Sequence, residues 1–475
     1  MSRTILKNTA WGVFGEIITR LSKMLLVVLM ARYLGAAEIG RYNVALAQAS
    51  MFLVFFDFGV MSIAVRELAR NPSPVTYFLY LSVKLLGTLS GIAAVALATT
   101  ALDMPDEERL LLLGLGLYLA LNDLSTFVFA VYRARSEFWR ETLLRTLFSV
   151  MQLAASVMAL LLGYEVGGVV VALALSAAIG LGPLIAETLK QGPRAMLDMQ
   201  SASAFVQAIR QCLPLAGMVL MGTLYTNLDI LVLGGYATAE EIGWYSVATK
   251  IIFGLLIMPV HYFQLATLPV FSAQLADGSL SQMRQHWMRG FVLSTTAGAI
   301  LILITANSSG WLVSLLFGAE FAPAAPILEI YALIGFLFYL YIPLSQLLLV
   351  MERQHLTFYI QILTLAVNAV SIFLFIPAFG IWGAVLAGGI THATMALLHF
   401  LFVWKTGGFT GDAEGRWAIF RVSVGLIAAV CIIRLGDDPA WSWLASTALF
   451  LTCAHRETFV LAQHFYSRTL GRPVF

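Results

Sequence analysis

The sequence contains little charge and few cysteines, and it lacks the short motifs of common enzyme classes. Charged residues make up only 11% of the 475 residues, against roughly a quarter in soluble domains. The three cysteines, Cys212, Cys431 and Cys453, lie far apart in or beside apolar runs, which excludes a disulfide framework and a metal site. No HExxH, P-loop, CxxC or strand–GxGxxG–helix pattern occurs, so metalloproteases, P-loop ATPases and dinucleotide enzymes are excluded.

Hydrophobic residues dominate the chain instead. They make up 60% of the residues, and the mean hydropathy is +0.86. A soluble protein of this size cannot bury so much apolar surface, so we expect lipid to cover most of it. The formal net charge is only +2, and no basic stretch with interleaved aromatic residues lies outside the apolar runs. These features exclude a nucleic-acid partner.

Apolar runs of about 20 residues predict fourteen transmembrane helices and therefore an all-α integral membrane protein. The fourteenth is the least regular, because His455, Arg456 and Glu457 interrupt its apolar run. Pro377 and Gly380 predict the turn between the eleventh and twelfth helices. The expected helices lie near 9–34, 42–65, 75–101, 109–131, 143–164, 166–189, 211–235, 242–271, 289–316, 325–350, 357–378, 380–404, 417–435 and 441–460.

An internal repeat divides this series of helices. Residues 33–47 (YLGAAEIGRYNVALA) recur 203 positions later as residues 236–250 (YATAEEIGWYSVATK), with eight of fifteen positions identical. The matches include Glu, Tyr and Gly, which chance similarity between apolar segments does not explain well. A duplicated hydrophobic half is typical of transporters, whose substrate path runs between the halves.

Basic residues outside the helices predict the orientation in the membrane. With the N-terminus in the cytoplasm, twenty Lys and Arg residues fall on the cytoplasmic side and only four, Arg32, Arg41, Arg109 and Arg434, on the outer side. Fourteen spans then place the C-terminus in the cytoplasm as well. Six spans separate the two copies of the repeat, so both face outward and the repeat is parallel rather than inverted.

The repeat also predicts the domain organisation. We expect an N-terminal lobe of six helices over residues 1–190, a polar cytoplasmic linker over 191–203 and a C-terminal lobe of six helices over 204–404. Residues 405–475 would add the two extra C-terminal helices and a cytoplasmic tail. No loop is long enough to hold a catalytic domain, which favours a transporter over an enzyme.

Polar residues inside the predicted helices are the candidate functional residues, because ionisable groups are costly in the bilayer. Glu16, Arg20 and Lys23 share one face of the first helix. Lys84 lies inside the third helix and Lys250 inside the eighth. The candidate counter-ions or coupling residues are the acidic residues Glu16, Asp57, Asp123, Asp229 and Glu329. A snorkelling or ion-paired structural role is the alternative for each of them.

The cations point to an anionic substrate. Arg20, Lys23 and Lys84 belong to helices that would line a cleft between two lobes, and Lys250 is the clear contribution of the second lobe. Arg and Lys in a cavity suit phosphate or diphosphate. The helical histidines His261, His392 and His399 could couple protons, but packing explains them more simply. The segment 132–145 (YRARSEFWRETLLR) predicts a cytoplasmic loop or interfacial helix that touches anionic headgroups.

Five segments carry a resemblance to a known family: residues 8–45, the DFG at 57–59, the RELAR at 66–70, LFGAEFAPAAPILEIYAL at 316–333 and NAVSIFLFIPAFGIWGAVLA at 368–387. They resemble the polysaccharide-biosynthesis flippases of the multidrug/oligosaccharidyl-lipid/polysaccharide (MOP) exporter superfamily. The similarity covers nearly the whole chain, and the order and spacing of these segments are more specific than any one of them.

The resemblance implies a V-shaped, two-lobed fold whose central cavity alternates between the two sides of the cytoplasmic membrane. The implied substrate is an oligosaccharide on undecaprenyl diphosphate, with Arg20, Lys23 and Lys84 at the diphosphate. It implies no bound cofactor. A proton or sodium gradient or the membrane potential would supply energy, and Asp57, Asp123 or Asp229 would pair with the cations or couple to an ion. A polysaccharide polymerase and glycosyltransferases would be partners.

The alternatives to an oligosaccharide flippase are two other transporters and one enzyme. A lipid II flippase would carry a similar diphosphate-linked sugar, so the residues do not separate it from the first interpretation. A drug or metabolite antiporter of the same superfamily should have acidic cavity residues for organic cations, which the intramembrane Arg and Lys residues argue against. A polysaccharide polymerase or ligase would need large outer loops with catalytic residues, and the sequence has none.

Overall fold

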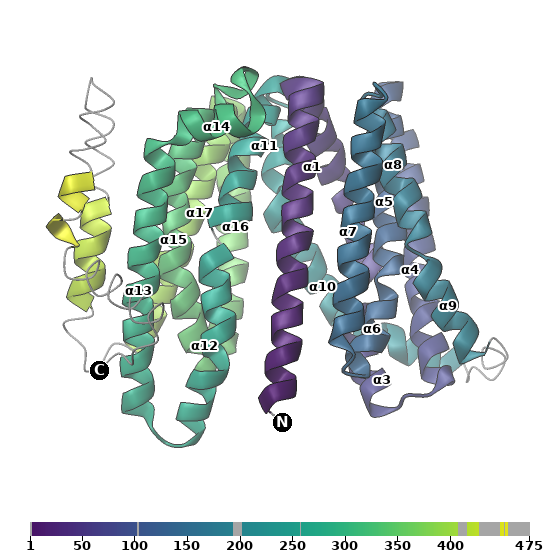
Figure 1. The fold of residues 1–475 in the computed structure, drawn as a ribbon, viewed down its shortest axis with the longest axis horizontal. Coiled ribbons are helices and arrows are strands. Elements are labelled where there is room, and N and C mark those ends of the chain that lie inside the picture. Colours follow the sequence, from purple (N-terminus) through teal and green to yellow (C-terminus); the bar gives the residue numbers. More distant parts are fainter. Residues whose placement is uncertain are drawn as a thin grey trace. The chain divides into compact units, whose positions relative to one another are not determined.

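The computed structural model describes residues 2–101, 104–192, 202–256, 258–406, 416–426, 447–450 and 452–454. Most of the expected linker, residues 427–435 of the expected thirteenth helix, most of the expected fourteenth helix and Cys431 lie outside these residues. Within them the chain folds into helices joined by short turns, and no strand occurs, which confirms the expected all-α class (Figure 1). The chain divides into two compact units, residues 1–246 and 247–475.

The first unit contains ten helices and most of an eleventh in the described part of the chain. α11 crosses the boundary between the units, which lies between Ser246 and Val247. The helices are α1 Ser2–Ser50, α2 Leu53–Asp57, α3 Val60–Arg70, α4 Pro74–Ala101, α5 Asp106–Ser125, α6 Phe127–Ala134, α7 Phe138–Leu161, α8 Val166–Ile179, α9 Gly182–Gln191, α10 Ala202–Leu233 and α11 Ala239–Ile251.

Three backbone breaks shape the start of this unit. Gly35, at φ 83°, divides α1 into the expected first helix and the start of the second. The expected helix 42–65 is interrupted twice. α1 ends at Ser50 and α2 begins at Leu53, and α2 is followed by Phe58 and Gly59, which both have positive φ, before the chain resumes as α3. Gly59 also packs against α10 so closely that an added Cβ would lie 2.5 Å from Leu215 Cβ. Both the backbone angle and the space therefore require glycine at position 59.

The core of the first unit lies among α3, α4 and α6. Tyr77, Phe78 and Phe127 are buried there and their rings make edge and tilted contacts with centroids 5.3–5.7 Å apart. α1 packs on α5 and α7, and α8 packs on α5 and α7 (Figure 1). α10 packs on α1, α2, α3 and α4, which explains why the compact unit extends beyond the lobe boundary expected at 191–203. The division into lobes at residues 1–190 and 204–404 was inferred from the repeat, and it stays a prediction.

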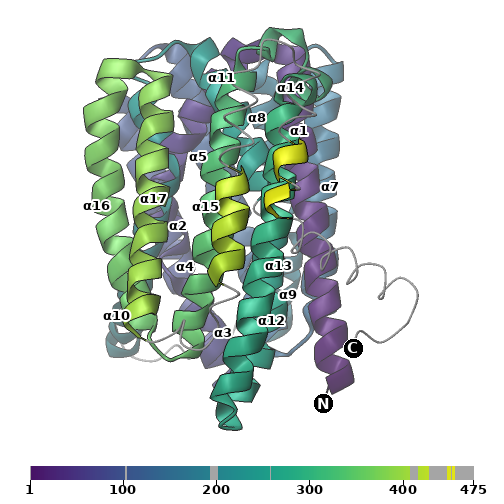
Figure 2. The same ribbon diagram turned by 90° about the vertical axis from the view of Figure 1, so that its left-hand side faces the viewer.

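The second unit is a separate helical bundle. Its helices are the π-helix Ile252–Leu256, α12 Met258–Ala276, α13 Leu280–Asn307, α14 Ser309–Phe317, the 3-10 turn Ala319–Phe321, α15 Ala324–Val350, α16 Gln354–Phe379 and α17 Ile381–Lys405. α15 packs on α12, α13 and α17 (Figure 2). The expected turn between the eleventh and twelfth helices is confirmed at Gly380, although Pro377 lies inside α16.

The helices have the length and composition of membrane spans. Among the residues that the structure describes, nine helical segments are long and apolar enough to cross a bilayer. The bent pair Gly15–Ser50 and Leu53–Arg70 could add a tenth. The chain is therefore a multi-pass membrane protein. The count of fourteen stays a prediction, because much of 405–475 is outside the described residues.

Candidate functional site

A chain of ion pairs joins α1, α6 and α7 in the first unit. The Arg133 guanidinium donates two hydrogen bonds to the Glu141 carboxylate, from Nε to Oε2 at 2.8 Å and from Nη2 to Oε1 at 2.6 Å. Arg145 contacts Glu141 on its own helix and also Glu16 Oε2 at 3.3 Å. Glu16 in turn accepts from Arg20 Nε at 2.7 Å. Three arginines thus share two carboxylates.

Arg133 and Arg145 border a cavity of about 320 Å³ inside the first unit. Arg133, Arg145 and Lys23 supply its positive charge, and Phe129 and Phe148 stack on each other with centroids 6.3 Å apart. Arg145 also lies over the Phe129 ring, 5.6 Å from its centroid. The lining residues are Thr19, Lys23, Met61, Asn122, Thr126, Phe129, Arg133, Arg145, Phe148, Ser149 and Gln152.

The two ends of the cavity differ in chemistry. α1 and α7 run parallel, since Glu16 pairs with Arg145 and Thr19 Oγ1 accepts from Ser149 Oγ at 3.3 Å. One helical turn further along, Lys23 is therefore level with Gln152. Gln152 Nε2 donates to Asn122 Oδ1 at 2.9 Å. One end thus holds arginines paired with carboxylates, and the other holds Lys23 beside two carboxamides.

Lys23 is the cation of this cavity that is open to an incoming anion. It has no carboxylate within ion-pair distance in the described part of the chain. Together the cavity and its ion-pair chain contain four cations, Arg20, Lys23, Arg133 and Arg145, against the two carboxylates Glu16 and Glu141. The excess positive charge suits an anion of about two charges.

Lys84 lies in a different place, fully buried among α2, α4 and α5. Its ammonium is 3.4 Å from Asp57 Oδ1 and 2.5 Å from Asp123 Oδ2, and the side chain is only 1% exposed. In this conformation Lys84 offers no surface to a substrate. The expected pairing with Asp57 and Asp123 is present, whereas the substrate role of Lys84 stays a prediction.

The remaining expected site residues do not join the cavity. Asp229, on α10, accepts a hydrogen bond from the Tyr245 hydroxyl and from the Ile230 backbone N–H. Lys250 and Glu329 belong to the second unit, in α11 and α15. The buried rings of His392 and His399 lie against Tyr341, with centroids 6.3 and 5.8 Å apart. The side chain of His261 is outside the described residues.

Sequence reasoning missed Arg133 and Arg145 as cavity residues and Glu141 as their ion-pair partner. The segment 132–145 was expected to form a cytoplasmic loop or interfacial helix, but most of it belongs to the end of α6 and the first turns of α7. Arg140 lies over the ring of Trp139, and both side chains are exposed. The four-residue spacing of Glu141 and Arg145 was the available signal, since it places both on one helix face.

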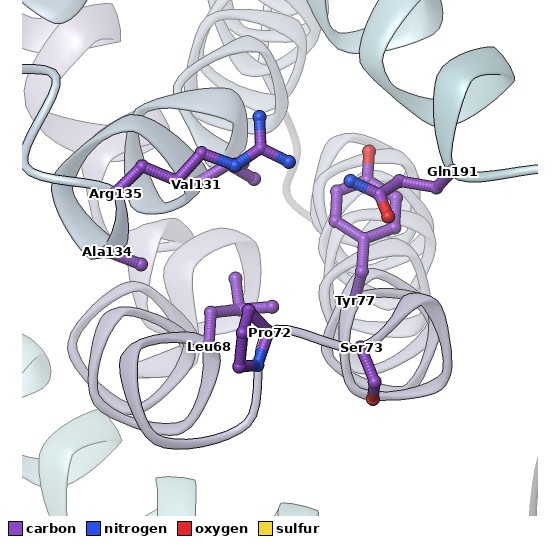
Figure 3. A pocket seen from close by; sticks show the side chains of 8 residues that line it. All are labelled: Leu68, Pro72, Ser73, Tyr77, Val131, Ala134, Arg135 and Gln191. Atoms are coloured by element: carbon purple, nitrogen blue, oxygen red, sulfur yellow. The ribbon is translucent and has the colours of Figure 1, made fainter.

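A second hollow in this unit is too small to hold a substrate. It measures about 30 Å³, which is room for little more than one water molecule. Figure 3 shows Tyr77 and Gln191 on one side of it and Leu68, Ala134 and Arg135 on the other. Glu187 accepts hydrogen bonds from Arg135 at 2.9 Å and from Gln191 at 2.8 Å. This network therefore joins α6 to α9.

Comparisons with known proteins agree with the fold. The inward closed conformation of the lipid II flippase MurJ superposes with a TM-score of 0.69, covering 98% of this chain and 100% of that chain at 15% identity. An inward-facing multidrug resistance MATE transporter of the MOP superfamily gives a TM-score of 0.62, with 82% and 94% coverage at 14% identity. These similarities establish the fold alone.

Sequence comparisons identify the family. The teichuronic acid biosynthesis protein TuaB of Bacillus subtilis (strain 168) is 23% identical over 229 residues, which cover 48% of this chain and 42% of that relative. The MatE family model matches residues 214–374, and the model described as "Polysaccharide biosynthesis protein" matches residues 5–274, more than half of the chain. The chain therefore belongs to the family described as "Polysaccharide biosynthesis protein".

Proposed function

We propose that the protein is a flippase that moves a polyprenyl-diphosphate-linked oligosaccharide from the inner to the outer leaflet for surface polysaccharide synthesis. The observation that carries this proposal is the cationic cavity of the first unit, in which Lys23 has no carboxylate partner among the described residues. Membership of the polysaccharide biosynthesis family and the likeness to a protein of teichuronic acid biosynthesis support it.

The chemistry of the cavity suits the diphosphate rather than the glycan. Its volume of about 320 Å³ is at the lower end of the ~300–1,000 Å³ of small-molecule sites. An oligosaccharide would exceed it, so the diphosphate would enter while most of the glycan stays outside. Lys23 and the arginines would bind the phosphate oxygens, and the Asn122 and Gln152 carboxamides would donate further hydrogen bonds.

A lipid II flippase is the second candidate, since the fold superposes over nearly its full length on one. Its substrate shares the diphosphate, so the same cations would serve both lipids. A cation-coupled drug antiporter fits less well, because Arg133, Arg145 and Lys23 would repel an organic cation. Transport of lipids that differ only in the sugar would separate the first two candidates.

The proposed orientation in the membrane rests on the distribution of basic residues along the sequence. We place the protein in the cytoplasmic membrane with both termini inside, following the excess of basic residues on that side. Energy would come from a proton or sodium gradient or from the membrane potential. Asp57, Asp123 and Asp229 are the carboxylates of the first unit that could couple to it. Glycosyltransferases and a polymerase would supply and consume the lipid-linked glycan.

Replacing Lys23 by alanine tests the anion site directly. Pyrophosphate should bind the purified variant about 10- to 100-fold more weakly than the parent, the loss expected for one charged hydrogen-bonding contact. Isothermal titration calorimetry measures the change. Arg140→Ala is the matched control, because Arg140 is exposed, pairs with Glu137 and does not line the cavity. Equal affinities in the parent and Lys23→Ala would refute the assignment of the site.

A further inference from the structure

The two copies of the internal repeat contact each other within the first unit. A Cβ added to Gly40 would lie 1.8 Å from the carbonyl oxygen of Ala239, and one added to Gly243 would lie 2.1 Å from that of Ala36. Gly40 is equivalent to Gly243 in the repeat, and Ala36 is equivalent to Ala239. The contact is therefore reciprocal, as in a pair of helices related by a two-fold axis.

Small residues make this approach possible. Each copy has alanine and glycine four positions apart, Ala36 and Gly40 in one and Ala239 and Gly243 in the other. Such pairs let helix backbones touch inside a membrane. Ala36 is fully buried, and Ile39 and Ile242 are buried beside it. Because backbone meets backbone, even a methyl group would prevent the two helices from reaching this distance.

The acidic side chains of the repeat bond within their own copies. Glu38 pairs with Arg41 at 3.1 Å. Glu241 accepts from the backbone N–H and the hydroxyl of Thr238, at 2.9 and 3.3 Å. These interactions survive if the two helices move apart. A crossing of this kind is either fully packed or open, because close-packed interfaces do not deform gradually.

We propose that the Gly40–Gly243 crossing is the closure on the outer side of the transport pathway, packed in this conformation and separated when the pathway opens outward. The assignment rests on the alternating access of the proposed function, and the charge distribution places both copies on the outer side. Both copies also occupy the same position in their halves, directly after the first long helix. A parallel duplication therefore brings equivalent surfaces together at this point.

Gly40→Ala and Gly243→Ala, separately and combined, test the closure. Gly222→Ala is the matched control, because a Cβ added to this helical glycine meets nothing within 4 Å. Met61→Cys, which lines the cavity, serves as reporter in a background with Cys212, Cys431 and Cys453 replaced by serine. The readout is the rate at which a membrane-impermeant maleimide labels the reporter from the outer side of right-side-out vesicles.

We expect each glycine variant to be labelled about tenfold faster or more than the parent, since overpacking of this size shifts a two-state equilibrium by at least that factor. Gly222→Ala should be labelled at the parental rate. The proposal would be overturned if the glycine variants were labelled at the parental rate, or if they no longer purified as folded protein. The Gly40–Gly243 crossing would then have only a structural role. The labelling requires no lipid substrate, so it is independent of whether the protein moves lipid-linked sugars.

Discussion

Replacing Lys84 by methionine should destabilise the first unit by about 3–5 kcal/mol, the range for breaking a buried ion pair from one side. Lys84 is 1% exposed, and its partners Asp57 and Asp123 are only 23% and 18% exposed. Methionine fills the space but leaves two carboxylates without their cation. The midpoint of thermal unfolding of the purified protein, followed by intrinsic fluorescence, measures the effect.

Two further variants make this expectation specific. Lys190→Met is the matched control, because Lys190 is exposed in the last turn of α9 and its loss should leave the midpoint nearly unchanged. Adding Asp57→Asn and Asp123→Asn to Lys84→Met should recover part of the stability, since neutral amides are cheaper to bury than carboxylates. A midpoint for Lys84→Met equal to that of the parent would show that the cluster is not a structural ion pair.

Replacing Arg20 and Lys23 together by alanine should slow lipid translocation about 10- to 100-fold, the effect of losing the charged contact of Lys23, about 1.5–3 kcal/mol, together with the positive charge of Arg20 beside the cavity. The change removes two of the four cations and leaves Arg133 and Arg145 opposite Glu16 and Glu141. The excess positive charge that favours a diphosphate then disappears. Lipid-linked oligosaccharide should accumulate on the inner leaflet of cells that carry the variant.

The control for this double variant is Arg66→Ala with Arg70→Ala. Both arginines are exposed and pair with Glu67 on α3, outside the cavity, so the same charge is removed without touching the site. Translocation should stay near the parental rate. Normal surface glycan in cells that express the Arg20→Ala, Lys23→Ala protein at the parental level would contradict the role of these cations.

Composition and periodicity predicted the class of fold because apolar runs of this length have few alternatives in a membrane. They did not predict where helices break. The expected helix 42–65 is interrupted between Ser50 and Leu53 and again at Phe58 and Gly59, where Gly59 packs closely on α10. Such a long-range contact leaves no periodic signal in the local sequence.

The candidate site was predicted in part. The shared helix face of Glu16, Arg20 and Lys23 was visible in the sequence, and the structure adds that Glu16 also binds Arg145 from α7. Lys84 could not be separated from these cations by residue type alone. Its distance from the cavity depends on how α2, α4 and α5 pack. In the same way, the sequence repeat indicated a duplicated half but did not predict that its two copies contact each other.

A reconstituted flipping assay tests the central claim most directly. Purified protein in proteoliposomes would receive a fluorescent polyprenyl-diphosphate-linked oligosaccharide in one leaflet, with and without imposed proton or sodium gradients and membrane potential. An enzyme added outside would report arrival in the other leaflet. We predict translocation that pyrophosphate inhibits and that Lys23→Ala reduces. No translocation under any gradient, together with uptake of organic cations by the same vesicles, would contradict the assignment as a lipid-linked oligosaccharide flippase.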